Sequence, residues 1–207
     1  MRCSRWLPLL LLACACGKDD GTAAAQKPAE PASGRKLAGV YPDQFKCESL
    51  TTLEALGQVL GGQVHVIDTP MSVPKGVPHP CNYEVNGEPW TYDIDCRDGA
   101  KQRADALFAQ YKQDSADMVQ HYNALADAGI KPTDAGIAIH APEAASEVQV
   151  GAKGLDHHGQ GLFFYDDDAP CYVRVVGPDA SKRLELARLV AKNLTFANAP
   201  MTPRPMR

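Results

Sequence analysis

Four cysteines spread over the main part of the chain constrain its fold more than any other feature: Cys47, Cys81, Cys96 and Cys171. No two of them have the C-x2-C spacing of a zinc site, and an even number at wide spacing is typical of disulfides in an exported protein. We therefore expect two disulfide bonds, with free buried thiols or a metal site as the alternatives. Four cysteines allow three pairings, and the residues alone do not select one.

The N-terminus has the pattern of an export signal. Arg2 and Arg5 precede an apolar run of about eight residues, much shorter than the roughly 20 that a membrane-spanning helix needs. The end of this segment, residues 1–16, resembles the lipobox of bacterial lipoproteins, in which a lipidated cysteine becomes the first residue of the mature protein. Cys14 and Cys16 both fit that position, and a signal peptide cut without lipidation is the alternative.

The lipobox resemblance implies a location. It predicts an exported protein that is held on the bacterial cell envelope, and so partnered with the membrane, through its N-terminal lipid. Neither candidate cysteine is followed by the aspartate that retains such lipoproteins in the inner membrane. The expected location is therefore the outer membrane, if the cell has one.

Composition divides the rest of the chain into three segments. Residues 17–40 are rich in alanine, proline and charge without an apolar period, which predicts a flexible tether. Residues 41–195 are expected to form one disulfide-linked domain, and the proline-containing residues 196–207 a disordered tail. The net charge of the 207 residues is −4, so the basic excess of a nucleic-acid binder is lacking and we expect no such partner.

Apolar periodicity predicts three helices in the domain. Thr51 and Glu54 match a capping box, which predicts a helix over residues 51–60. A period of three to four residues predicts a long helix over residues 100–128, and Asp179 is expected to cap the last helix.

Alternating and β-branched segments predict six strands. The strongest signal is the hairpin around Asn86-Gly87, a dipeptide typical of two-residue turns, which would place Tyr83 opposite Trp90. The six expected strands cover residues 64–67, 81–85, 90–95, 147–150, 161–165 and 171–176.

The order of these elements predicts an α+β fold, with a mostly antiparallel sheet and the helices on one face. It also contains two strand-strand-strand-helix units, which are candidates for an internal duplication. Within this arrangement we prefer the pairs Cys47–Cys81 and Cys96–Cys171. They would join the first helix to the first hairpin, and the middle of the sheet to its last strand.

One part of the domain carries a second resemblance. Cys47-Glu48-Ser49-Leu50-Thr51, a helix ending at glycine, and Cys81-Asn82-Tyr83 resemble a pattern of small secreted bacterial lipoproteins of unknown function, mainly actinobacterial. In these, a Cys-x-Leu-Leu/Thr helix and a Cys-x-Trp/Tyr strand recur. The present chain differs in its second cysteine pair and its longer middle helix. The resemblance implies a disulfide between Cys47 and Cys81 and carries over no activity.

No catalytic motif is present in the sequence. The chain lacks G-x-S-x-G, G-x-x-x-x-G-K-[ST] and H-E-x-x-H, so we expect neither enzymatic activity nor a cofactor. Two alternatives remain. One is a metal-binding module formed by His157, His158 and the three aspartates Asp166 to Asp168, and the other is an envelope hydrolase whose residues are distant in sequence.

The glycine-rich stretch of residues 151–161 is the strongest candidate for binding. Polar side chains alternate with glycines beside an aromatic strand, which suits a recognition loop on a rigid sheet, although a plain connection would have the same composition. We therefore expect a non-enzymatic binding or interaction module whose partner is an envelope protein or a small ligand. The candidate binding residues are Lys153, Asp156, His157, His158 and Gln160.

Overall fold

The computed structural model describes residues 37–68, 71–129, 141–166 and 168–205. The candidate lipidation residues Cys14 and Cys16 lie outside these ranges, as does Asp167. Among the helices within them, none has a stretch long and apolar enough to cross a lipid bilayer.

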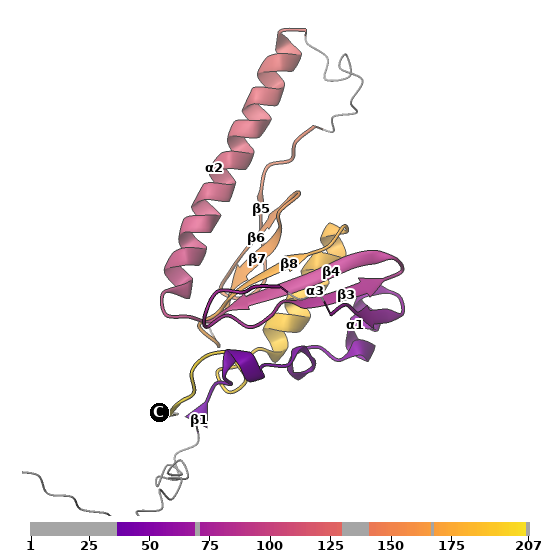
Figure 1. The fold of residues 1–207 in the computed structure, drawn as a ribbon. Coiled ribbons are helices and arrows are strands. Elements are labelled where there is room, and N and C mark those ends of the chain that lie inside the picture. Colours follow the sequence, from indigo (N-terminus) through magenta and orange to yellow (C-terminus); the bar gives the residue numbers. More distant parts are fainter. Residues whose placement is uncertain (1–36, 69–70, 130–140, 167, 206–207) are drawn as a thin grey trace, which may run out of the picture. The chain divides into compact units, whose positions relative to one another are not determined.

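A seven-stranded antiparallel sheet forms the centre of the domain (Figure 1). The first meander contains β2 (Val64–Val66), β3 (Cys81–Val85) and β4 (Glu88–Asp95). The second contains β5 (Ser146–Val148), β6 (Lys153–His157), β7 (Gly161–Tyr165) and β8 (Tyr172–Val176). The meanders meet where β4 pairs with β8, which gives the order β2-β3-β4-β8-β7-β6-β5. The predicted α+β fold with a mostly antiparallel sheet is confirmed.

The predicted hairpin is present between β3 and β4. Asn86 and Gly87 form its two-residue turn, with φ angles of 56° and 81°. Positive φ at both positions matches the twist of the flanking strands, which explains the Asn-Gly sequence. Tyr83 pairs with Trp90 as expected, and Pro89 is accommodated within β4.

Two helices, α1 (Leu53–Leu60) and α3 (Ala180–Asn193), cover one face of the sheet. The side chain of Asp179 caps α3 as predicted, by accepting a hydrogen bond from the Lys182 N–H. The cap of α1 lies one residue later than predicted, because Thr52 accepts from the Ala55 N–H. Thr51 is buried instead, and its hydroxyl lies 2.8 Å from that of Tyr92.

The third helix, α2 (Ala100–Asp127), lies on the opposite face. Its Ala104 and Phe108 pack on Leu155 of β6 and Phe163 of β7, whereas the neighbours Leu162 and Phe164 face α1 and α3. The expectation that all helices share one face is therefore wrong. Alternate residues of a strand point to opposite faces, so the apolar run in β7 needs cover on both.

The candidate duplication is not reflected in the fold. The second meander has four strands, because residues 153–157 form β6 where the sequence predicted a loop. The helices that follow the two meanders, α2 and α3, also lie on opposite faces of the sheet.

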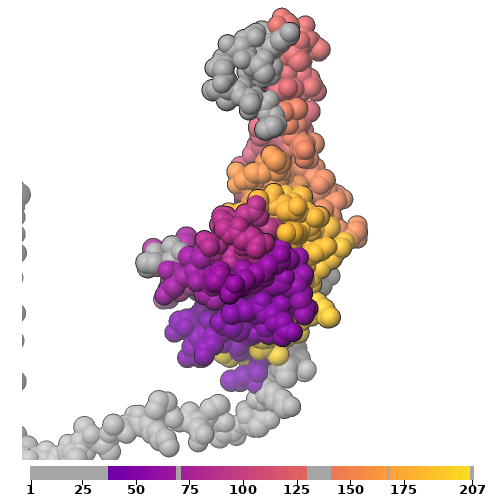
Figure 2. Space-filling model, turned by 90° about the vertical axis from the view of Figure 1, so that its right-hand side faces the viewer, coloured from indigo at the N-terminus to yellow at the C-terminus, as the bar shows by residue number. Residues whose placement is uncertain are grey.

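The C-terminal residues 196–205 form part of the domain, which corrects the predicted disordered tail. Ala199 and Met201 are buried, since the apolar side chains of this segment extend the main core. β9 (Arg204–Pro205) pairs with β1 (Leu37–Ala38), so the last residues of the predicted tether also belong to the fold. Figures 1 and 2 show these indigo and yellow segments side by side at one end of the domain.

Both preferred disulfides are present. Cys47 is bonded to Cys81, and Cys96 to Cys171. The second bond directly continues the β4–β8 ladder, whose last pair is Asp95 and Tyr172, and it closes a separation of 75 residues. The first ties the segment before α1 to the start of β3.

Removing the disulfide between the two meanders should lower stability without changing the fold. We expect Cys96→Ala/Cys171→Ala to lower the free energy of unfolding by about 2 to 4 kcal/mol, because the unfolded chain gains conformational freedom. Urea unfolding followed by circular dichroism measures this. As a control, reductant should destabilise the wild type more than this variant. Equal stability of the oxidised wild type and the variant would contradict the prediction.

Candidate functional site

The predicted glycine-rich recognition loop is a β-hairpin formed by β6, a short turn and β7. Gly154 lies inside β6 rather than in a loop. A Cβ at this position would lie 2.7 Å from Cγ1 of Val150 and 2.8 Å from the carbonyl oxygen of Val148. The glycine therefore allows close packing of β5 on β6. From the sequence alone, a glycine of this kind cannot be distinguished from a glycine in a loop.

Asp156 of this hairpin forms a buried ion pair. Arg183 of α3 donates from Nε and Nη2 to its two carboxylate oxygens, at 3.0 and 2.8 Å. The third nitrogen of Arg183, Nη1, donates to the carbonyl of Gly177. Both side chains are largely buried, so Asp156 anchors α3 on the sheet and is not available to a ligand.

The other candidate binding residues of the hairpin are separated from Asp156. Lys153 and His157 point to the opposite face, toward α2. Lys153 pairs with Asp105, and buried His157 packs edge-on against the Tyr111 ring. His158 and Gln160 are exposed in the turn. The structure therefore does not bring these five side chains together.

The alternative metal site gains no support from the geometry. His157 and His158 precede β7, whereas Asp166 and Asp168 follow it, so the length of a strand separates the two groups. The Oδ1 atom of Asp166 accepts the Asp168 N–H within a tight turn. Across the described ranges, no group of three or more His, Cys, Asp or Glu side chains could hold a metal ion.

The alternative hydrolase site is also not assembled in the part of the chain that the structure describes. Buried His157 contacts Tyr111, and the other described histidines are exposed at four separate places: β2, the loop before β3, α2 and the β6–β7 turn. None of them lines either of the two hollows described below.

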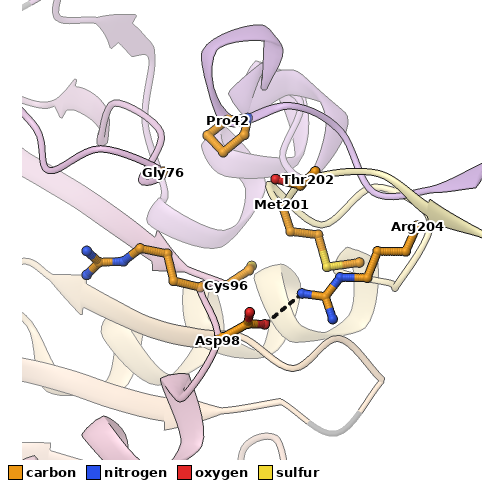
Figure 3. Close-up of a pocket in the computed structure, with 8 residues that line it drawn as sticks. Pro42, Gly76, Cys96, Asp98, Met201, Thr202 and Arg204 are labelled. Carbon is orange, nitrogen blue, oxygen red and sulfur yellow. Dashed lines mark hydrogen bonds and ion pairs between the residues drawn. The ribbon is translucent and has the colours of Figure 1, made fainter. Parts of the chain in front are cut away.

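A hollow of about 250 Å³ lies beside the end of β4, next to the β1–β9 pair (Figure 3). Four separate segments of the chain form it, and Cys96 in its wall belongs to the Cys96–Cys171 disulfide. The lining combines apolar contacts with two arginines, an aspartate and a hydroxyl group. Its residues are Pro42, Gly76, Cys96, Arg97, Asp98, Met201, Thr202 and Arg204.

An arginine-rich ion-pair network fixes the charged wall of the hollow. Arg97 donates from Nε and Nη2 to Asp95 at 2.9 and 2.7 Å, and Arg103 Nη2 donates to both oxygens of the same carboxylate at 3.1 Å. Burial raises the pKa of Asp95, but the hydrogen bonds from Arg97 and the charges of both arginines outweigh it and hold that pKa below its usual value. Asp95 therefore stays ionised and orients both guanidinium groups.

A second ion pair closes the hollow on its outer side. Arg204 Nη2 lies 2.8 Å from Oδ1 of Asp98, and Figure 3 shows the two side chains pointing toward each other. This pair is open to solvent, with 92% of the Asp98 side chain exposed. Pairs of this kind contribute about 0 to 1 kcal/mol, so Arg204 can exchange its partner easily.

No pattern in the sequence indicates this hollow, because its parts lie far apart along the chain. Its lining runs from Pro42 to Arg204, and the longest continuous stretch is the three residues Cys96-Arg97-Asp98. The last lining residues also fall in the segment predicted to be a disordered tail.

A larger and more open hollow of about 510 Å³ lies along the distal half of α2. Its lining is mostly small and uncharged, with Asp127 as the one charged residue: Ala116, Val119, Gln120, Asn123, Ala124, Asp127 and Ala144. It therefore offers less for specific recognition than the arginine-lined hollow.

No family model, curated protein or solved structure matches this chain.

The two ion pairs of the β6 hairpin should differ strongly in their effect on stability. Asp156→Ala leaves Arg183 buried without its partner, so we expect a loss of about 3 to 5 kcal/mol in the free energy of unfolding. Lys153→Ala, three residues away in the same strand, breaks an exposed ion pair and a cation–π contact with Phe108, and should cost about 1 kcal/mol. Chemical unfolding of both variants checks this, and similar losses would contradict it.

The network around Asp95 should contribute to stability in a pH-dependent way. The folded-state pKa lies below the unfolded value of about 3.9, so the contribution is complete above that value and is lost as the pH falls through the folded-state pKa. Asp95→Asn should be less stable than the wild type at pH 7, and the difference should shrink below about pH 4.

Urea midpoints at pH 7 and pH 3 measure the effect of Asp95→Asn. Asp68→Asn, which changes an exposed aspartate outside the network, is the matched control and should leave both midpoints close to those of the wild type. A gap between Asp95→Asn and the wild type that stays constant with pH would contradict the prediction.

Proposed function

We propose that this chain is an exported, lipid-anchored protein of the bacterial cell envelope whose domain binds a ligand without catalysing a reaction. The observation that supports binding best is the hollow beside β4, which four chain segments and two ion pairs assemble. The two disulfides are consistent with an extracellular or periplasmic protein.

Binding fits the chemistry of the hollow better than catalysis. Its sulfur atom from Cys96 is part of a disulfide and is therefore not a nucleophile. Thr202 supplies a hydroxyl group, but no histidine is present in the lining to act as its base. Arginine and aspartate side chains suit the recognition of a charged ligand.

The proposed anchor fits the point at which the chain enters the domain. Residues 17–36 would link a lipidated Cys14 or Cys16 to β1. Each buried acyl CH2 contributes about 0.8 kcal/mol, so the several chains of a lipoprotein anchor would hold the domain stably at the membrane.

Metabolic labelling tests the anchor. The wild type should incorporate radiolabelled palmitate and sediment with envelope membranes, and the double variant Cys14→Ala/Cys16→Ala should do neither. Cys3→Ala removes a cysteine that precedes the apolar run and is the matched control, which should behave like the wild type. A wild-type protein that stays unlabelled would contradict the proposal.

Native mass spectrometry of the protein purified gently from the envelope tests the hollow as the binding site. We expect a bound small molecule that Thr202→Trp removes, because the indole would fill the hollow. Gln160→Trp places the same side chain on the exposed β6–β7 turn and should leave the ligand bound. Loss of the ligand in Gln160→Trp alone would instead favour the hairpin as the site.

A further inference from the structure

We infer that the hollow beside β4 is an oxyanion site that takes the phosphate group of a small ligand or of a lipid headgroup. This inference rests on the proposed function, because it names the ligand class of the same site. It follows from the balance of charge, the unused donors and the place of the hollow in the chain.

The charged groups at the hollow carry a positive excess. Arg97, Asp98 and Arg204 line the hollow, and Asp95 and Arg103 join them through the ion pairs of Arg97 outside the lining. One carboxylate, that of Asp95, is shared by two guanidinium groups, which leaves one positive charge without a counterion. The chain as a whole has a net charge of −4, so this is a local reversal of sign. A bound anion would balance it.

The arginines also carry more donors than their partners use. Arg97 uses Nε and Nη2 on Asp95, and within the described part of the chain its Nη1 group makes no hydrogen bond. Arg204 uses Nη2 on Asp98, and no described residue accepts a hydrogen bond from its Nε or Nη1 group. The planar guanidinium fork matches the oxygens of phosphate, so these groups are suited to hold it.

Asp98 competes with such an anion. Its carboxylate is the present partner of Arg204, yet it is almost fully exposed and contributes little as an ion pair. A phosphate group entering the hollow would replace the Asp98 carboxylate as the partner of Arg204. Asp98 therefore acts as a weak internal substitute for the ligand.

The position of the hollow next to the start of the domain favours a membrane lipid as the source of the phosphate group. Arg204 belongs to β9, which pairs with β1, the point at which the segment from the proposed anchor enters the domain. With a lipid on Cys14 or Cys16, only about 20 residues of chain would separate this strand from the membrane. Arginines near an anionic membrane surface are attracted to it.

Calorimetry with inorganic phosphate tests the site, using residues 17–207, which lack both candidate lipidation cysteines and therefore carry no lipid. We expect saturable binding that weakens as NaCl is added. Arg204→Gln should weaken it by about tenfold, because a hydrogen bond to a charged group is lost. Asp98→Asn should tighten it, because the competitor for Arg204 is neutral. Arg188→Gln, on the exposed side of α3, is the matched control and should bind as the wild type does.

The opposite effects of the two substitutions separate a binding role from a structural one. If Arg204→Gln fails to fold, as judged by circular dichroism, Arg204→Lys retains the charge without the fork and should still weaken binding. No heat of binding with phosphate, or equal affinity in Asp98→Asn and the wild type, would overturn the inference. Tighter binding of acetate than of phosphate would also overturn it.

Vesicle sedimentation identifies the source of the phosphate. The same unlipidated chain should sediment with vesicles containing phosphatidylglycerol, but not with phosphatidylcholine alone, if lipid headgroups are the ligand. Phosphate binding without sedimentation supports the inference with a free small ligand as the source. Because this chain carries no lipid, failure of the lipid anchor leaves both experiments unaffected, and the two proposals can fail separately.

Discussion

The pairing of β4 with β8 is the interaction on which the rest of the structure depends. It joins two meanders that are otherwise separate, and the Cys96–Cys171 bond covalently continues its ladder. Without this pairing the sheet would split into pieces of three and four strands, and α1, which packs beside β2, would be separated from α3, which packs on β7 and β8. The pairing also holds Cys96, Arg97 and Asp98 in place as the chain leaves β4, so the wall of the hollow is fixed by the same contact that completes the sheet.

The apolar run of β7 determines how the helices are arranged around this sheet. Leu162 and Phe164 fill the core beneath α1 and α3, while Phe163 fills the core beneath α2. Only about half of α2 is used for this purpose: no residue beyond Ser115 is buried, although the helix continues to Asp127. On the other face, the buried pair of Asp156 and Arg183 ties α3 to β6.

The features that depend on residues close together in the sequence could be predicted, and those that depend on distant contacts could not. The Asn86-Gly87 hairpin, the Asp179 cap and the α+β class rest on neighbouring residues, and all were predicted correctly. β6 was not predicted, because glycines in this segment were interpreted as loop residues. Gly154 is instead a strand residue that allows close packing. The C-terminal segment was missed because its prolines outweighed Ala199 and Met201, whose burial depends on distant partners. The hollow was beyond sequence reasoning, since it exists only where four remote segments meet.

Asp95 and Asp98, the two aspartates of the ion-pair network at the hollow, have different roles because they differ in burial. Asp95 is mostly buried and is held by two guanidinium groups, so it fixes the orientation of both. Asp98 is exposed and is held by one guanidinium group in direct contact, but water and salt around the pair weaken the attraction. The firmly held Asp95 keeps its arginines in position. The loosely held Asp98 can be displaced by an incoming anion. This difference in burial, rather than the presence of charge itself, makes the end of β4 suited to bind an anion reversibly.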